Sequence, residues 1–310
     1  MDATRKGLSM RRCVLPILIA VALAVSGCGV VAKQAAQIVL LAVADRGIDA
    51  FFDDEGADVH ISSSASRGGA IDGDAPGLYG GTRRAATCNP AKLIKFLGRN
   101  PTKAKAWAGA HKIKVSQISA FIRRLTPVIL RRDTLVTNHG FKGGKANAVS
   151  AVLQAGIAVL VDDGGVPLVK CNCGNPLTEA TVKLDHEVEI TVPKGSRNWG
   201  FKRERAVRVR KPARKVTSLQ LVQPGTGTAF SRPVGTGGTV DGTPVEAPPE
   251  PVAEPDPMIP AASPTPSGTA PTEGGTATPT PTITPPGPVD PSGPPGSPGP
   301  GAAGSPPVTG

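Results

Sequence analysis

The chain has 310 residues, a formal net charge of +11 and a sequence pI of about 9.7, and only 3% of its residues are aromatic. Such a length can bury one adequate core, which the scarcity of aromatic residues predicts to be aliphatic. The sequence holds no Gly-x-Ser-x-Gly, His-Glu-x-x-His or phosphate-loop motif, which argues against the enzyme classes that these motifs define.

Residues 1–27 have the three parts of a secretory signal: a basic start, an apolar run from residue 14 to 25, and small residues before a cleavage site. The run is shorter than the about 20 apolar residues that a membrane-spanning helix needs. The basic residues of the start are Arg5, Lys6, Arg11 and Arg12.

The segment Val25-Ser26-Gly27-Cys28 resembles the lipobox of bacterial lipoproteins. The resemblance implies that the Cys28 thiol carries a diacylglyceryl group and that residues 28–37 tether the protein to the outer face of the cytoplasmic membrane. Acyl chains contribute about 0.8 kcal/mol per buried methylene, so two or more of them anchor a protein stably. The alternative is a soluble secreted protein with a cysteine at its cleavage site by chance.

Three short helices are expected after the tether. Residues 30–52 read as a strand or a helix, and residues 60–84 as a loop. A helix over 89–98 has Asn at its cap, Pro at its first position and Gly at its end. A second helix starts at Pro101, and a third, over 116–125, has an apolar stripe that stops before Pro127.

The pattern changes to strands from residue 127 onward. Residues 157–171 predict a hairpin, because Asp162-Asp163-Gly164-Gly165 separates two runs rich in β-branched residues. Further strands are expected at 127–138, 149–156, 182–192, 206–210 and 218–222. The expected fold class is α+β, with three short helices packed on a small antiparallel sheet or partly open barrel that spans residues 38–235.

Ten Lys or Arg residues and one glutamate lie between residues 194 and 215. Secretion makes nucleic acid an unsuitable partner, whereas lipid headgroups and anionic cell-wall polymers are the polyanions that a basic surface outside the membrane would attract. The other interpretation is a solvated face that keeps the domain soluble. The candidate anion-binding residues are Arg203, Arg205, Arg208 and Arg210.

Residues 236–310 are rich in Pro, Gly, Thr and Ser and predict a disordered tail, because such a segment cannot bury enough apolar surface to offset the loss of chain entropy. The tail has no Lys or Arg and is weakly acidic. Its acidic residues are Asp241, Glu246, Glu250, Glu254, Asp256, Glu273 and Asp290.

Three cysteines remain once Cys13 leaves with the signal and Cys28 is acylated: Cys88, Cys171 and Cys173. An oxidising compartment favours a disulfide from Cys88 to either of the other two, which would leave one thiol free. A redox pair and a metal site are the alternatives, although structural zinc usually requires four ligands with wider cysteine spacing. The sequence predicts no cofactor.

Several segments resemble an actinobacterial extracellular domain family of unknown function. They include "VTNHG" at 136–140 and "CNCGNPL" at 171–177, and the resemblance covers residues 38–235. Members of that family look like lipoproteins or the outward-facing parts of membrane proteins, including some receptor-type serine/threonine kinases. The resemblance implies that Cys88, Cys171 and Cys173 belong to the family pattern, and it implies no activity.

A binding or sensor module that is not an enzyme is the leading functional hypothesis. Residues 137–140 are expected to form a polar turn, in which Asn138 and His139 are candidate binding residues. A structural cell-envelope spacer is one alternative. A hydrolase is another, with His139 oriented by Asp133 and with Ser150 or a cysteine as the nucleophile.

Overall fold

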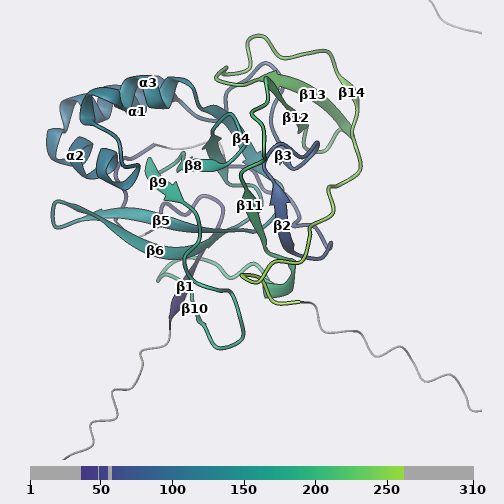
Figure 1. Cartoon of the computed structure of the whole chain (residues 1–310), viewed down its shortest axis with the longest axis horizontal. Coiled ribbons are helices and arrows are strands. Elements are labelled where there is room, and N and C mark those ends of the chain that lie inside the picture. Colours follow the sequence, from purple (N-terminus) through teal and green to yellow (C-terminus); the bar gives the residue numbers. More distant parts are fainter. Residues whose placement is uncertain (1–35, 48, 55–57, 262–310) are drawn as a thin grey trace, which may run out of the picture. The chain divides into compact units, whose positions relative to one another are not determined.

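In the part of the chain that the computed structural model describes, fourteen strands form one mixed sheet and three helices gather on one side of it (Figure 1). The structure describes residues 36–47, 49–54 and 58–261. The predicted signal peptide, the acylation site Cys28, the tether up to residue 35 and the tail from residue 262 lie outside the described residues.

The helices lie where the sequence places them. Helix α1 spans Pro90–Arg99, α2 spans Pro101–Ala110 and α3 spans Ile118–Arg123, with a 3₁₀ turn η1 at Val115–Gln117. The Asn89 side chain caps α1 by accepting a hydrogen bond of 2.9 Å from the Lys92 N–H, as its place before a proline predicts. Helix α1 continues past Gly98 and ends only at Arg99.

The strands are short, and many were also expected. The strands of the first half are β1 (Gln37–Leu41), β2 (Gly69–Asp72), β3 (Tyr79–Gly80), β4 (Thr126–Leu130), β5 (Thr134–Lys142), β6 (Lys145–Leu153) and β7 (Ala158–Val161). Those that follow are β8 (Pro167–Lys170), β9 (Asn175–Thr178), β10 (Glu189–Thr191), β11 (Val207–Arg210), β12 (Ser218–Val222), β13 (Thr228–Pro233) and β14 (Val245–Glu246), with a 3₁₀ turn η2 at Arg203–Arg205.

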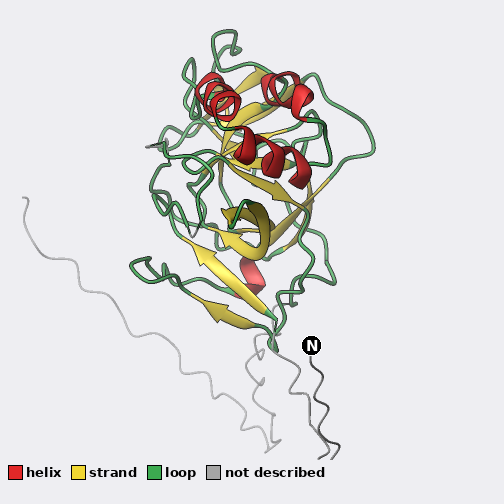
Figure 2. Ribbon diagram, turned by 90° about the vertical axis from the view of Figure 1, so that its left-hand side faces the viewer, coloured by secondary structure: helices red, strands yellow, loops and turns green. Residues whose placement is uncertain are grey.

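The expected fold class is wrong. The sheet is large and mixed, with the order β10-β1-β6-β5-β9-β8-β7-β4-β3-β12-β13-β14, and β11 joins β2 to β5 beside this path. Strands β1 and β6, β1 and β10, β2 and β11, and β3 and β12 pair in parallel. The protein is therefore mostly sheet, with the helices as a local cover (Figure 2).

Long-range pairing explains the error. Strands β2 and β3 lie in residues 60–84, where Gly and Ser give a loop-like pattern, and they become strands because β11 and β12 pair with them from far along the chain. Hydrogen bonds to a distant partner leave no local periodicity in so short a strand.

The described residues form three hydrophobic clusters. The largest contains Val128, Val159 and Leu221, the second fills the space beneath the helices around Trp107, and the third lies around Ile38 and Leu40 of β1. The Trp107 indole is fully buried and donates to the Gly174 carbonyl oxygen at 2.9 Å, which links α2 to the turn between β8 and β9.

A disulfide joins Cys88, just before α1, to Cys171 at the end of β8, with a Cα–Cα distance of 5.6 Å. This bond agrees with the predicted staple and selects Cys171 over Cys173. It closes a loop of 83 residues, which corresponds to roughly 4 kcal/mol of stabilisation in the chain-entropy model. Cys173 is a free, buried thiol whose pKa is raised by burial.

Residues 236–261, which the sequence assigns to the tail, lie against the domain and are named here the C-terminal strap (Figure 1). The strap adds β14 to β13, and Glu254 exchanges two backbone hydrogen bonds of 2.8 Å with Ala70 of β2. Only glycine fits at Gly69, where an added Cβ would lie 2.0 Å from the Glu254 carbonyl oxygen. The ordered chain thus runs past the boundary expected at residue 235.

Four acidic residues of the strap form ion pairs with arginines of the domain. Both side chains of the Arg232–Asp241 pair are fully buried, and Asp241 accepts from Nε at 2.9 Å and from Nη2 at 2.8 Å. The other pairs join Arg132 to Glu250, Arg210 to Glu254, and Arg208 to Asp256. Acidic residues that the sequence assigns to a solvated tail therefore pair with four arginines of the domain.

Candidate functional site

The segment expected to be a polar turn lies inside strand β5. Residues 137–140 are paired with β6, and the actual turn is Gly143-Gly144, with φ values of 59° and 76°. A two-residue Gly-Gly loop with positive φ at both positions is a standard hairpin turn. Successive side chains of a strand point to opposite faces, so Asn138 and His139 serve different surfaces.

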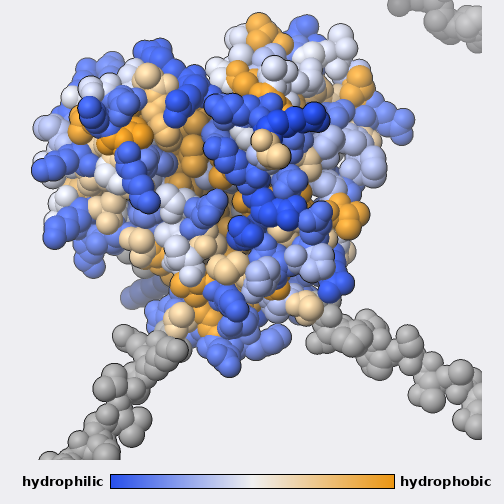
Figure 3. All heavy atoms as spheres, in the orientation of Figure 1, coloured by the Kyte–Doolittle hydropathy of each residue, from blue (hydrophilic) through white to orange (hydrophobic). Residues whose placement is uncertain are grey.

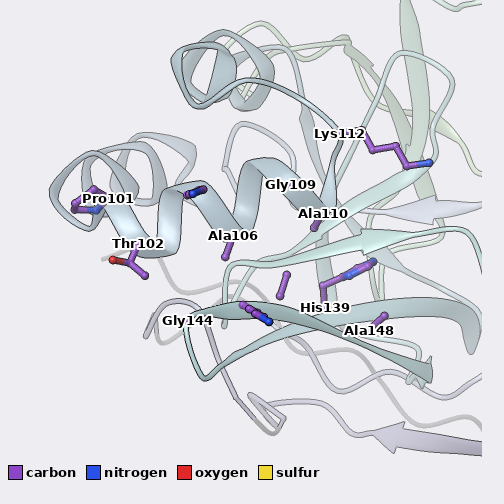
Figure 4. A pocket seen from close by; sticks show the side chains of 12 residues that line it. Pro101, Thr102, Ala106, Gly109, Ala110, Lys112, His139, Gly144 and Ala148 are labelled. Atoms are coloured by element: carbon purple, nitrogen blue, oxygen red, sulfur yellow. The ribbon is translucent and has the colours of Figure 1, made fainter.

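A hollow of about 970 Å³ lies between α2 and the β5–β6 hairpin and is named here the lysine groove (Figure 4). Helix α2 and the turn after it contribute Pro101, Thr102, Lys105, Ala106, Gly109, Ala110 and Lys112. The hairpin contributes His139, Gly144, Lys145, Ala146 and Ala148.

Small residues keep the lysine groove open. In Figure 4 the Ala106 and Ala110 side chains point from α2 toward the hairpin, where Ala148 lies. Ala146 of the same strand also lines the hollow. An added Cβ at Gly109 would meet no atom within 4 Å. Alanine and glycine at these facing positions leave space that the fold itself does not fill.

The charge of the lysine groove has one sign. Lys105, Lys112 and Lys145 are exposed, and the described lining contains no Asp or Glu. Within the described ranges, no carboxylate lies within 4 Å of any of these three ammonium groups. Their charges therefore face solvent, where an incoming anion can meet them.

Lys112 occupies a backbone position that normally belongs to glycine. Helix α2 ends in a Schellman motif: the Lys112 N–H bonds the Gly109 carbonyl at 3.1 Å, and the Ile113 N–H bonds the Ala108 carbonyl at 3.0 Å. The motif sets φ of Lys112 at 55°, a left-handed value that costs a non-glycine residue roughly 1–2 kcal/mol. The turn thereby projects a lysine from the end of the helix.

His139 lines the lysine groove, and His111, the C-cap residue of α2, lies between two residues that line it, Ala110 and Lys112. Burial lowers the pKa of His139, whose Nε2 lies 2.9 Å from the Thr178 hydroxyl. The His111 ring packs against Trp107 and Phe121, with ring centroids 4.4 and 4.7 Å away. Burial, and then the charge of His139, lower the pKa of His111 to about 3.

The residues of the hydrolase hypothesis do not form a triad. Asp133 accepts hydrogen bonds of 2.9 Å from the Ala155 N–H and from the Trp199 indole, and neither of its carboxylate oxygens bonds His139 in the described structure. Burial raises the pKa of Asp133. Ser150 shares a hairpin face with His139 but lies opposite Thr137, whereas His139 lies opposite Ala148.

The predicted arginine row is largely occupied by groups of the protein itself. Arg208 and Arg210 bind the acidic residues of the strap, and Arg203 donates to the Asp185 and Val188 carbonyls. The side chain of Arg205 is exposed. Among the described residues, the lysine groove brings three exposed lysines to one hollow, whereas Arg205 alone of the arginine row is exposed. The hairpin signal Gly143-Gly144 in the sequence would have pointed to Lys145.

No metal site is formed by His, Cys, Asp and Glu side chains in the part of the chain that the structure describes. The CxC pair is not a metal or redox pair of its own, because Cys171 is bonded to Cys88.

Comparison with known proteins identifies a family. A family model described as a domain of unknown function (DUF6777) matches residues 69–235. No curated protein and no solved structure matches the chain. The matched range contains α1 to α3 and both strands of the hairpin, and so it contains the whole lysine groove.

Proposed function

This chain belongs to the DUF6777 family, whose description states no activity, and from this premise we propose that it is an extracytoplasmic binding module for anionic cell-envelope components. The observation that carries the proposal is the lysine groove, in which three exposed lysines surround a floor of small residues and no carboxylate lines the wall. The ligand is a wall polymer or lipid headgroup that carries phosphate.

Phosphate suits this groove for two reasons. Lysine ammonium groups bind phosphate as point charges and need no fixed planar geometry, so exposed and flexible side chains are sufficient. The alanine and glycine floor accepts the carbon backbone that joins phosphates in a polymer. Each basic residue near an anionic surface contributes about 1 kcal/mol at physiological salt.

The proposed location of the module, outside the cytoplasmic membrane, is supported by the sequence. The basic start, the apolar run and the lipobox-like end at Cys28 support an acylated protein at the outer face of the membrane. In the described part of the chain, none of the helices has both the length and the apolar character to cross a bilayer. The resemblance to actinobacterial lipoproteins and to the outward parts of receptor-type kinases supports the same address.

Binding of a synthetic poly(glycerol phosphate) tests the function. The single variants Lys105→Gln, Lys112→Gln and Lys145→Gln should each weaken binding about fivefold, which corresponds to about 1 kcal/mol per lysine, and affinity should fall with added salt. Lys95→Gln is the matched control, because Lys95 is an exposed lysine on α1 outside the groove. Equal losses in the control and the groove variants would overturn the proposal.

The address has its own test. Mass spectrometry of the membrane-extracted protein should find a diacylglyceryl group on Cys28, and Cys28→Ser should move the protein to the soluble fraction. An unmodified Cys28 in a membrane-free protein would contradict the anchor without touching the groove.

A further inference from the structure

A second hollow, of about 450 Å³, lies on the opposite face of the hairpin and is named here the β1 cavity. Its walls come from one face of β5, β6 and β1, together with the residues at the end of β10 and Asp49. Asn138 faces this cavity, whereas its neighbour His139 faces the lysine groove. The two sites therefore share strand β5 as a wall.

The lining of the β1 cavity continues the main hydrophobic core out to the surface. Leu41 and Ala151 are buried core residues at its floor, and Val39 packs against the same core. Val149 and Val192 are 41% and 38% exposed and lie at its mouth. Most of the visible surface is hydrophilic (Figure 3), so two exposed valines that line the same cavity form a local apolar opening.

One polar group inside the cavity has no partner. Asn138 is 6% exposed, and its buried Oδ1 accepts no hydrogen bond in the described structure. A buried acceptor without a donor costs about 1–3 kcal/mol, which a bound donor would recover. Asp49 adds a carboxylate at the rim, where its backbone carbonyl is held by a 2.6 Å hydrogen bond from the Phe141 N–H.

The charge of this cavity is opposite to that of the lysine groove. Among its described lining residues there is no Lys or Arg, and the polar groups are a carboxylate, amides and a hydroxyl. The volume falls within the range of about 300–1,000 Å³ that is usual for small-molecule sites, which are mostly apolar with a few placed polar groups.

We propose that the β1 cavity binds a single-chain amphiphile whose hydrocarbon body lies on the apolar floor and whose polar end donates hydrogen bonds from hydroxyl or amine groups to Asn138 and Asp49. The observations that decide the class are the core-like floor, the unpartnered Asn138 oxygen and the absence of basic lining residues. An acidic polar end, as in a fatty acid, faces repulsion from Asp49 and finds no counterion.

The test compares two probes with the same twelve-carbon acyl chain, 1-monolauroylglycerol and laurate, each below its aggregation concentration. The full-length protein with Cys28→Ser is used, so that no detergent competes for the cavity, and calorimetry measures binding. We expect one molecule of monolauroylglycerol per chain and at least tenfold weaker binding of laurate. Equal affinity for laurate, or no binding of monolauroylglycerol, would overturn the proposal.

Two variants locate the binding. Val149→Arg places a charge at the mouth and should weaken monolauroylglycerol binding at least tenfold. Val115→Arg, at a 49% exposed valine of η1 outside the cavity, should leave binding unchanged. Asn138→Leu should still bind monolauroylglycerol, but its preference for monolauroylglycerol over laurate should be smaller. Retained binding shows that the fold is intact, so the smaller preference reports the lost hydrogen bond. Binding that survives Val149→Arg at full strength would place the ligand elsewhere.

Discussion

At the scale of single residues, the turn that ends α2 beside the lysine groove carries side chains that stability alone would not select. Lys112 holds a left-handed backbone conformation, and the His111 ring nitrogen Nε2 is buried without a partner. Strained or unsatisfied groups that cluster in one place support a hypothesis of function, because the rest of the fold must compensate for them. Both lie at the end of α2.

Lys112→Gly should separate stability from binding. Glycine adopts the left-handed conformation without strain, so the free energy of unfolding should rise by roughly 1 kcal/mol in urea titrations. The same change removes one groove cation and should lower the affinity for poly(glycerol phosphate) about fivefold. A variant that is more stable and also binds with full affinity would remove Lys112 from the site.

His111 should make the protein sensitive to acid. Its folded pKa of about 3 lies below its usual value, so the unfolded state binds the proton more readily. This contribution to stability is complete above about pH 7 and is lost as the pH falls toward 3, at about 1.4 kcal/mol per pH unit between pH 6 and 4. His111→Phe should remove that slope from urea titrations taken between pH 7 and 4, and an unchanged slope would contradict the assignment.

At the scale of elements, the groove depends on the spacing between α2 and the β5–β6 hairpin. Trp107 anchors the helix to the β8–β9 turn, and the disulfide from Cys88 to Cys171 holds the start of α1 next to that turn. Helix α2 is thus tied directly to the β8–β9 turn, and its neighbour α1 is tied to the same region by the disulfide, while small residues of α2 face the hairpin. The lysine groove therefore depends on both elements together and on neither one alone.

Gly109→Leu should fill the groove without harming the fold. An added Cβ at this position meets no atom within 4 Å, and leucine favours a helix over glycine by about 0.8 kcal/mol, so stability should stay equal or rise. Affinity for poly(glycerol phosphate) should fall more than tenfold. Gly98→Leu on α1, where an added Cβ also meets nothing within 4 Å, is the control and should bind normally. Equal binding by the two variants would place the ligand outside the groove.

At the scale of the whole molecule, the sequence predicted local structure better than it predicted the overall fold. The Asn89-Pro90 cap and the Asp162 to Gly165 turn were recognisable because each signal lies within a few residues. The sheet was not recognisable, because β2 and β3 form only by pairing with β11 and β12, more than 130 residues away. The arginine row was recognisable as basic, but its partners in the strap lie in a segment whose composition resembles a disordered tail.

Asp241→Asn should destabilise the entire domain. Removing one partner of a buried ion pair leaves the Arg232 charge uncompensated, which costs about 3–5 kcal/mol. Glu246→Gln, at an exposed position of the same strap, should change stability by less than about 0.5 kcal/mol. Urea titration of both variants decides the matter, and similar curves would mean that the strap does not stabilise the domain.

The position of β1 has a mechanical consequence. This strand is the first described element after Cys28, and it pairs in parallel with β10 on one side and β6 on the other. A pull along its axis from the N-terminal side would load the hydrogen bonds of both ladders together in shear, so that they resist as a group and are not opened one after another. A protein held by its N-terminus would thus bear tension first at β1, where two parallel ladders of hydrogen bonds share the load.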